Sequence, residues 1–223
     1  MTHSLRSEDD MSAADDALAD AFFEARKADL ERRLKPKRFR HSLGVSQTAE
    51  TLARTYGADV STARLAGLLH DWDKCLDDQA IRDRARDLGT DVPDLVLQAM
   101  PQLLHGPTAA RALAREFPQI PPEALSAIEK HTAASVDMSD LDLIVYVADV
   151  IEPSRSFDGV DKLRRAVGRV GLEDLFVLVF QHSLENLVAT GKRLHPDTVD
   201  VWNHYVERKL KREGTPSGAA KGR

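Results

Sequence analysis

Apolar residues recur three and four positions apart along most of this chain, and prolines and glycines interrupt the pattern at intervals. That spacing places apolar side chains on one face of an α-helix, whereas a half-buried strand alternates every second residue. Proline and glycine end helices, because proline lacks a backbone N–H and glycine suits a helix end. The pattern therefore predicts an all-α fold. The expected helices span residues 15–34, 39–56, 62–70, 77–88, 107–116, 121–131, 139–151, 160–169, 172–189 and 196–210.

Two segments, residues 143–151 and 176–180, are apolar enough to be considered as buried strands. In the first segment, however, the large side chains recur at helical spacing. The pattern around the second runs from Leu172 to Leu187, which is too long for a strand. Both segments are therefore predicted to be helices.

The chain is expected to form one main domain with a segment at each end. Its 223 residues, of which 42% are hydrophobic and 30% charged, suit a single globular core. Residues 36–210 are assigned to that domain, and Pro36 is expected to end the helix before it. Residues 1–35 form an N-terminal extension, disordered over residues 1–13 and then helical. Residues 211–223 are rich in Gly, Pro and Ser and are expected to be a flexible tail.

Composition argues against several classes of partner. The net charge of -5 disfavours nucleic acid, since that affinity comes from Lys and Arg at the phosphates. No apolar run approaches the ~20 residues that span a bilayer, and the acidic N-terminus lacks the apolar centre of a secretory signal. The single cysteine, Cys75, cannot form an intrachain disulfide, which fits a cytoplasmic protein. A homodimer through Phe22, Phe23 and Leu30 of the extension is an open alternative.

The dipeptide His70-Asp71 ends a helix that is almost wholly apolar. An imidazole and a carboxylate at the end of a buried helix can turn towards one metal ion, and that mixture favours a transition metal. Alone, the dipeptide is weak evidence and favours a histidine that caps a helix C-terminus beside a solvated aspartate.

Other residues strengthen the metal-site interpretation. His41 lies in the preceding helix, and Asp149 lies in an apolar helix where an unpaired carboxylate would be costly to bury. His105 and His131 add two imidazoles in the central region. Clusters of groups whose pKa is easily perturbed mark functional sites. The sequence thus predicts a metal site made of ligands at the ends and inside of apolar helices, namely His41, His70, Asp71 and Asp149.

Several motifs appear in an order that resembles a known family. The order His, His-Asp, Asp in a helical protein is the HD-domain signature. R-x-x-H-S-L-G-V, A-G-L-L-H-D-W-D-K and L-H-G-P-T-A-A are followed by K-H-T, Y-V-A-D-V-I-E-P-S-R, F-D-G-V-D-K-L-R and G-K-R-L-H-P-D-T-V. These motifs start at Arg38, Ala66, Leu104, Lys130, Tyr146, Phe157 and Gly191. The pattern over about residues 37–207 resembles the YqeK family of bacterial HD-domain hydrolases.

The resemblance implies symmetrical hydrolysis of diadenosine tetraphosphate, a small dinucleoside polyphosphate, to two ADP. It implies iron as the metal, with Mn, Co or Zn as alternatives. The metal-ligand positions of the family match His41, His70, Asp71 and Asp149. The positions near the phosphates or nucleotide match Arg38, Lys74, His105, His131, Thr132 and Arg155. Catalytic roles are expected for Asp71, Lys74 and His105, and a second metal held by His105 and His131 is an alternative role for those histidines.

The positions of the basic residues are consistent with phosphate binding even without the family resemblance. Hydrolysis of a polyphosphate requires neutralisation of the phosphoryl oxygens, which a metal and nearby cations can supply. Lys74 follows His70 by about one helical turn, and Arg38 precedes His41 by three residues. Arg155 lies in a loop, where its guanidinium could contact a phosphate at two points.

This sequence departs from the family pattern in two places. After the K-H-T motif the family has T-G-R-P-G, whereas residues 133–137 here read A-A-S-V-D, which stiffens the loop and removes an arginine. Asp73 replaces a small residue, and we expect a solvated acid there, with a general base or a partner to a ligand histidine as the alternatives. The altered loop keeps two functional alternatives open. These are hydrolysis of a mononucleotide, alarmone or cyclic nucleotide, and nucleotide sensing without hydrolysis.

Overall fold

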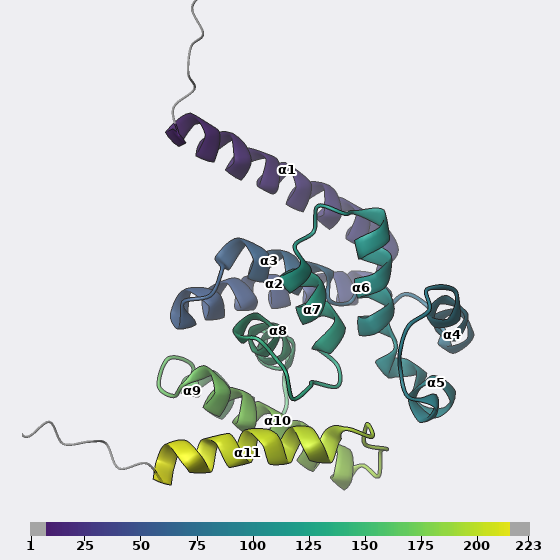
Figure 1. Ribbon diagram of the computed structural model, residues 1–223, viewed down its shortest axis with the longest axis vertical. Coiled ribbons are helices and arrows are strands. Elements are labelled where there is room, and N and C mark those ends of the chain that lie inside the picture. Colours follow the sequence, from purple (N-terminus) through teal and green to yellow (C-terminus); the bar gives the residue numbers. More distant parts are fainter. Residues whose placement is uncertain (1–7, 215–223) are drawn as a thin grey trace, which may run out of the picture.

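The computed structural model describes residues 8–214, with side chains described for residues 20–212. Within that range every regular element is a helix (Figure 1), so the predicted all-α class is confirmed. The elements are α1 (Glu8–Arg33), α2 (Pro36–Tyr56), α3 (Val60–Leu69), α4 (Asp78–Asp87), α5 (Asp94–Ala99), η1 (Pro101–Leu103), α6 (His105–Glu116), α7 (Pro122–Lys130), α8 (Asp140–Ile151), α9 (Val160–Ala166), α10 (Leu172–Ala189) and α11 (Thr198–Gly214). None of these helices is long and apolar enough to cross a membrane.

Helix α8 forms the centre of the fold. It packs against α2, α3, α7 and α10 (Figure 1), and most of its residues are buried. A helix that is apolar around its whole circumference needs neighbours on every side. Its start is fixed by a capping box, in which Ser139 and Asp142 each accept a hydrogen bond from the other's backbone N–H. The helix is therefore a rigid support for the side chains at its C-terminal end.

Two glycines allow the helices around α8 to approach closely. A Cβ atom on Gly67 of α3 would lie 3.0 Å from the Ser46 Cα of α2. A Cβ atom on Gly106 of α6 would lie 2.9 Å from the carbonyl oxygens of Ile128 and Glu129 in α7. Side chains at these positions would push the helix pairs apart. The glycines thus set the spacing of the α2–α3 and α6–α7 pairs.

A second, smaller core lies beside the main one and was only partly predicted. It is made by α4, α5, η1 and the start of α6, with Ile81, Val96, Met100 and Leu104 among its buried residues. The sequence pattern predicts α4 but neither α5 nor η1. These elements have six and three residues, which is too short for a helical periodicity to show.

The structure corrects the expected helix boundaries at both ends. α1 begins at Glu8, so residues 8–13 are helical rather than disordered, and residues 1–7 lie outside the described residues. Pro36 is the first residue of α2, a position where its missing N–H costs nothing, and α1 has already ended at Arg33. α11 continues to Gly214, and the remainder of the predicted tail lies outside the described residues.

The apolar residues of α1 pack against their own chain. Leu30 is completely buried and Phe23 nearly so. The Phe22 ring meets Phe117 edge-on, with ring centroids 6.0 Å apart. Phe23 and Leu30 therefore pack within their own chain, whereas Phe22 is partly buried, and the homodimer contact that the sequence suggested stays a prediction. The helix itself packs against α2 and α3.

Asp73 is not the solvated acid that the sequence predicts. Its side chain is completely buried and lies between two arginines. Arg84 of α4 donates to its carboxylate at 2.7 Å. Arg33, the last residue of α1, donates to it at 3.4 Å and lies 4.4 Å from the centre of the Trp72 ring. The N-terminal extension is thus joined by charge to the turn that follows His70-Asp71.

We predict that Arg33→Met lowers the free energy of unfolding by roughly 1–3 kcal/mol, because it leaves a buried carboxylate with one cation instead of two. Arg32→Met is the matched control, since Arg32 is exposed and its ion pair among the described residues is with Asp29 on the same helix. It should change the free energy by less than about 0.5 kcal/mol. Urea unfolding of the three proteins measures both effects. Equal losses in the two variants would contradict this account of Asp73.

Candidate metal centre

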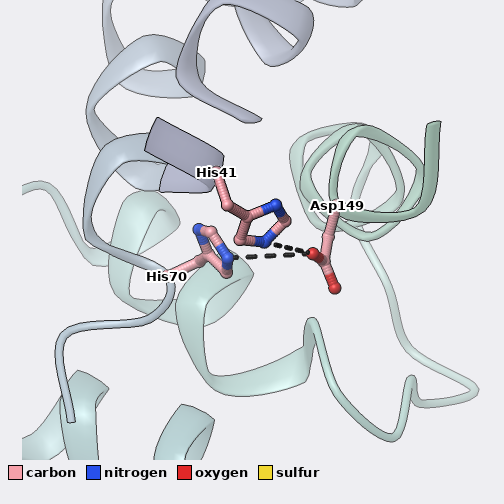
Figure 2. Close-up of side chains that lie close together, drawn as sticks. All are labelled: His41, His70 and Asp149. Atoms are coloured by element: carbon pink, nitrogen blue, oxygen red, sulfur yellow. Dashed lines mark ion pairs between the residues drawn. The ribbon is translucent and has the colours of Figure 1, made fainter. Parts of the chain in front are cut away.

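Six potential metal ligands converge from five helices. His41 comes from α2, and His70 and Asp71 follow the end of α3. His105 begins α6, His131 follows the end of α7, and Asp149 lies in the last turn of α8. All are buried except Asp149, whose side chain keeps 22% of its exposure. Figure 2 shows His41 and His70 facing Asp149 from separate elements.

Each of the four histidines has its Nδ1 fixed by an acceptor outside the cluster. Three of them donate from Nδ1 to the carbonyl three residues earlier: His70 to Gly67 at 2.7 Å, His105 to Gln102 at 2.8 Å and His131 to Ile128 at 2.7 Å. His41 Nδ1 lies 2.9 Å from a carboxylate oxygen of Glu152. A carbonyl or carboxylate can only accept, so the proton of each neutral ring sits on Nδ1. All four Nε2 atoms then carry lone pairs.

Those Nε2 lone pairs point at other electron-rich atoms. His41 Nε2 lies 2.9 Å from Asp149 Oδ1, and His105 Nε2 lies 3.0 Å from His131 Nε2. His70 Nε2 is buried and has no hydrogen-bond partner among the described residues. Facing lone pairs repel one another unless a cation lies between or beside them. The donor set is therefore one that a metal ion fits.

The titration of these groups follows from their surroundings. Burial, together with the rings of His105 and His70, lowers the pKa of His131 to about 3, so that this ring is neutral. Burial also lowers the pKa of His105. The pKa of His70 shifts upward, because Asp71 and Asp149 outweigh the opposing effect of burial. The carboxylates thus draw positive charge, either a proton or a metal ion, to His70.

The two aspartates remain ionised despite their surroundings. Burial by itself would raise the pKa of Asp71, but the His70 and His105 rings hold it well below its usual range. Burial would also raise the pKa of Asp149. The hydrogen bond with His41 and the charges of His70 and Arg155 outweigh burial and keep that pKa far below its normal value. Ionised carboxylates are the form that binds metal.

The geometry divides the potential ligands into two overlapping groups. His41, His70 and Asp149 have ligand atoms within 4.8 Å of one another, and so do His70, Asp71 and His131. His70 belongs to both groups. The four residues predicted from the sequence therefore lie together, and His131 joins them. His105 is bound into the second group by its contacts with His131 and with Asp71, whose Oδ1 lies 3.2 Å from its Nε2.

Three cations that the sequence singled out lie around this cluster. Arg38 donates to Asp71 at 2.9 Å, and Arg155 donates to the side chain of Asp149 at 2.6 Å. Lys74 Nζ lies 3.2 Å from His105 Nδ1, and burial lowers the pKa of its amine. Arg38 and Arg155 keep more than a third of their side-chain exposure. They can therefore contact both the cluster and a ligand arriving from solvent.

Thr132 is the one predicted residue that does not contact the cluster. Its hydroxyl donates to the carbonyl of Leu103 at 3.4 Å. It opens the altered loop 133–137, where Ala134 has a φ of 60°, the left-handed conformation that favours glycine. The family pattern has a glycine at this position. The alanine therefore holds this conformation at an energetic cost.

Sequence reasoning missed the buried acid that holds His41. Glu152 lies against His41 Nδ1 and also accepts from the backbone N–H of Ser154 at 2.7 Å. Acids that hold a ligand histidine fix its ring and raise its basicity. Sequence reasoning also missed the backbone carbonyls that accept the Nδ1 protons of the other three histidines. Each carbonyl lies three residues before its histidine, so chain position alone could have indicated it. Helix ends leave such carbonyls without a partner, as at the ends of α3 and α7.

Comparison with known proteins gives consistent matches over most of the chain. The sequence profile described as "HD domain" matches residues 38–154. A protein of Halalkalibacterium halodurans named "Bis(5'-nucleosyl)-tetraphosphatase, symmetrical" is 32% identical over 78% of this chain and 91% of its own length. A Bacillus subtilis protein of the same name is 31% identical over 79% of this chain and 94% of its own.

A solved structure supports the same fold. The crystal structure of a "predicted HD superfamily hydrolase involved in NAD metabolism" from Clostridium acetobutylicum matches with a TM-score of 0.77 and 35% sequence identity. The match covers 83% of this chain and 97% of that chain.

We predict that Glu152→Gln weakens the binding of a divalent transition metal by about tenfold or more, because it removes the charge that holds and polarises His41. Equilibrium dialysis with Co²⁺ measures the affinity. The control is Glu123→Gln, an exposed acid at the start of α7. Unchanged affinity in Glu152→Gln would show that His41 does not need this partner.

We also predict that Ala134→Gly stabilises the protein by about 0.5–1 kcal/mol, because glycine adopts a positive φ without the steric conflict of a Cβ atom. Ala133→Gly, at the neighbouring position without a positive φ, should instead destabilise it by a similar amount. Thermal unfolding of both variants beside the wild type checks the opposite signs.

Proposed function

This chain belongs to the HD-domain family, and we propose on that premise that it hydrolyses diadenosine tetraphosphate symmetrically to two ADP with a bound divalent metal. One observation carries the proposal. Four histidine Nε2 atoms and two ionised carboxylates converge on a buried centre that three cations surround. This combination suits the hydrolysis of a polyphosphate, because it can hold a metal and neutralise several phosphate charges together.

The relatives support the choice of substrate. The chain spans about nine-tenths of the length of the two proteins named as symmetrical tetraphosphatases. A dinucleoside tetraphosphate also needs the cations that lie at the entrance to the centre. We place the activity in the cytoplasm, since the sequence contains one cysteine and no disulfide.

We assign the metal to His41, His70, Asp71 and Asp149, with iron as the first choice among Fe, Mn, Co and Zn. A mixed set of imidazole and carboxylate ligands suits these ions. When bound, such an ion would lower the pKa of a coordinated water and polarise a phosphoryl oxygen. His105 and His131, which face each other at 3.0 Å beside Asp71, are the residues that would hold a second ion.

The protein's own cations are assigned to the phosphates. Arg38 and Arg155 are half-exposed and lie directly against Asp71 and Asp149. Each guanidinium has further N–H groups that can donate to phosphate oxygens. Lys74 supplies a third positive charge on the His105 side of the centre. Thr132 and His131 are assigned to substrate contacts near that side.

Proton transfer is assigned to His105 and Asp71. The His105 Nδ1 proton is held by the Gln102 carbonyl, so its Nε2 is the atom that can accept a proton from the attacking water. The water oxygen forms a bond to one of the two central phosphorus atoms, and the bond from that phosphorus to the bridging oxygen breaks. The bridging oxygen leaves on the second ADP, and Lys74 stabilises its charge. Asp71 Oδ1 lies 3.2 Å from the same Nε2, so it would accept a hydrogen bond from the proton that His105 gains and would stabilise the charged ring.

We predict that the metal-loaded protein converts diadenosine tetraphosphate to ADP as the sole early product, as separated by ion exchange. Asp71→Ala should lower kcat/KM by at least about a hundredfold, because it removes a metal ligand and the partner of His105. Asp87→Ala, an exposed acid at the end of α4, is the matched control and should retain full activity.

Three outcomes would contradict this proposal. AMP plus ATP would show an asymmetric cut. Turnover of a mononucleotide, alarmone or cyclic nucleotide in preference to the dinucleotide would assign the site to another substrate. Tight nucleotide binding without hydrolysis in the metal-loaded protein would indicate a sensing role.

A further inference from the structure

A large cavity lies between α8, α10 and the loop that leads into α11. We call it the α8–α10 cavity. Its volume is about 770 Å³, which is within the range of pockets that bury small ligands. Tyr146, Phe180 and Leu187 contribute aromatic and apolar surface to it, and Lys192 and Arg193 lie at its α11 side. The assigned metal ligands do not line it, so its role is separate from metal binding.

The position of the cavity can be described relative to the four histidines of the centre. Their rings contact one another in sequence: the centroids of His41 and His70 are 5.2 Å apart, those of His70 and His131 are 5.0 Å apart, and those of His131 and His105 are 4.9 Å apart. The rings thus form a histidine row that runs from His41 to His105.

The α8–α10 cavity adjoins the His105 end of this row. Thr132, which follows His131 directly, lines the cavity. Gln102 also lines it, and its carbonyl is the group that accepts the Nδ1 proton of His105. Tyr146 belongs to the same helix as Asp149 and precedes it by three residues. The wall of the cavity and the wall of the metal centre are therefore made of the same elements.

A second pocket adjoins the other end of the row. It has a volume of about 510 Å³ and is lined by His41 together with Arg38, Arg155 and Phe157. We call it the arginine pocket. Two unlike pockets thus lie at opposite ends of one row of potential metal ligands.

The proposed substrate has a matching two-ended form. A symmetrical cut takes place at its middle, so equal halves, each a nucleoside with two phosphates, extend in two directions from the reacting bond. The aromatic and apolar surface of the α8–α10 cavity suits a purine ring, because stacking and burial both favour a flat base. Among the described residues that line it, none is acidic and two are exposed cations, which suits an anionic ligand.

We propose that the α8–α10 cavity binds one nucleoside half of the dinucleotide, while the other half lies along the arginine pocket. This inference rests on the proposed function. It adds the orientation of the bound substrate, which extends from the arginine pocket across the metal centre to the α8–α10 cavity. The two halves are chemically identical, but the protein holds them by different means. One is held mainly by aromatic and apolar surface, and the other mainly by arginines.

The decisive variant fills the cavity. Leu187 lines it, whereas its neighbour Val188 is 67% exposed and does not. We expect Leu187→Trp to raise the KM for diadenosine tetraphosphate about tenfold or more, since the larger side chain occupies space that the base needs. Val188→Trp adds the same bulk outside the cavity and should stay within about twofold of the wild type. ADP titrated calorimetrically into the metal-loaded protein should bind at two sites per chain in the wild type and at one in Leu187→Trp.

A second pair of variants guards against misfolding of Leu187→Trp. Arg193 is exposed at the cavity, and Arg165 is exposed on α9 away from it. Arg193→Glu should raise the KM for the dinucleotide several-fold, and Arg165→Glu should not, because only the first places a negative charge beside the bound half.

The outcomes separate this inference from the proposed function. Normal hydrolysis with an unchanged KM in both Leu187→Trp and Arg193→Glu would overturn the assignment of the cavity and leave the proposed function intact. If the wild type does not hydrolyse the dinucleotide, the proposed function fails, and the ADP titration still decides the inference. A single ADP site in the wild type, unaffected by Leu187→Trp, would overturn it.

Discussion

The structure depends on the convergence of histidine lone pairs and carboxylates in a buried place. Such groups are costly to remove from water unless each is paired. The protein pairs their outer sides: three imidazoles donate to backbone carbonyls, and His41 contacts Glu152. The inner sides remain electron-rich and face one another. A metal cation would complete this arrangement, because Nδ1 protons held by outside acceptors leave the four Nε2 atoms free to bind it.

The helices are arranged to bring these side chains together. α8 is surrounded by its neighbours and carries Asp149 in its last turn. Gly67 and Gly106 permit the close crossings that place His70 beside α2 and His105 beside His131. The turn after His70 is held from outside, because Asp73 lies between Arg84 and the last residue of α1. The N-terminal extension therefore contributes Arg33 as one of the two cations that balance the buried charge of Asp73.

The proposed reaction is symmetrical, but the surroundings of the centre are not. Arginines and Phe157 lie at the His41 end of the histidine row, and an aromatic and apolar cavity lies at the His105 end. The altered loop 133–137 begins at the second of these, since Ala133 lines the cavity. A change in the loop would therefore act on one half of a bound dinucleotide. Within this loop Ala134 holds a positive φ, a conformation that glycine adopts at lower cost.

The sequence by itself determined the helical class, nearly all of the helices and the candidate residues for a metal site. Helical periodicity is a local property, and a histidine or aspartate at the end of an apolar helix is visible without coordinates. α5 and η1 could not be found, because they are shorter than the periodicity that reveals a helix. Only the tertiary structure decided that Glu152 holds His41, that Asp73 is buried and that two unlike pockets lie at the ends of the histidine row. Each of these depends on which segments, far apart in the chain, come to lie side by side, and no local pattern records that choice.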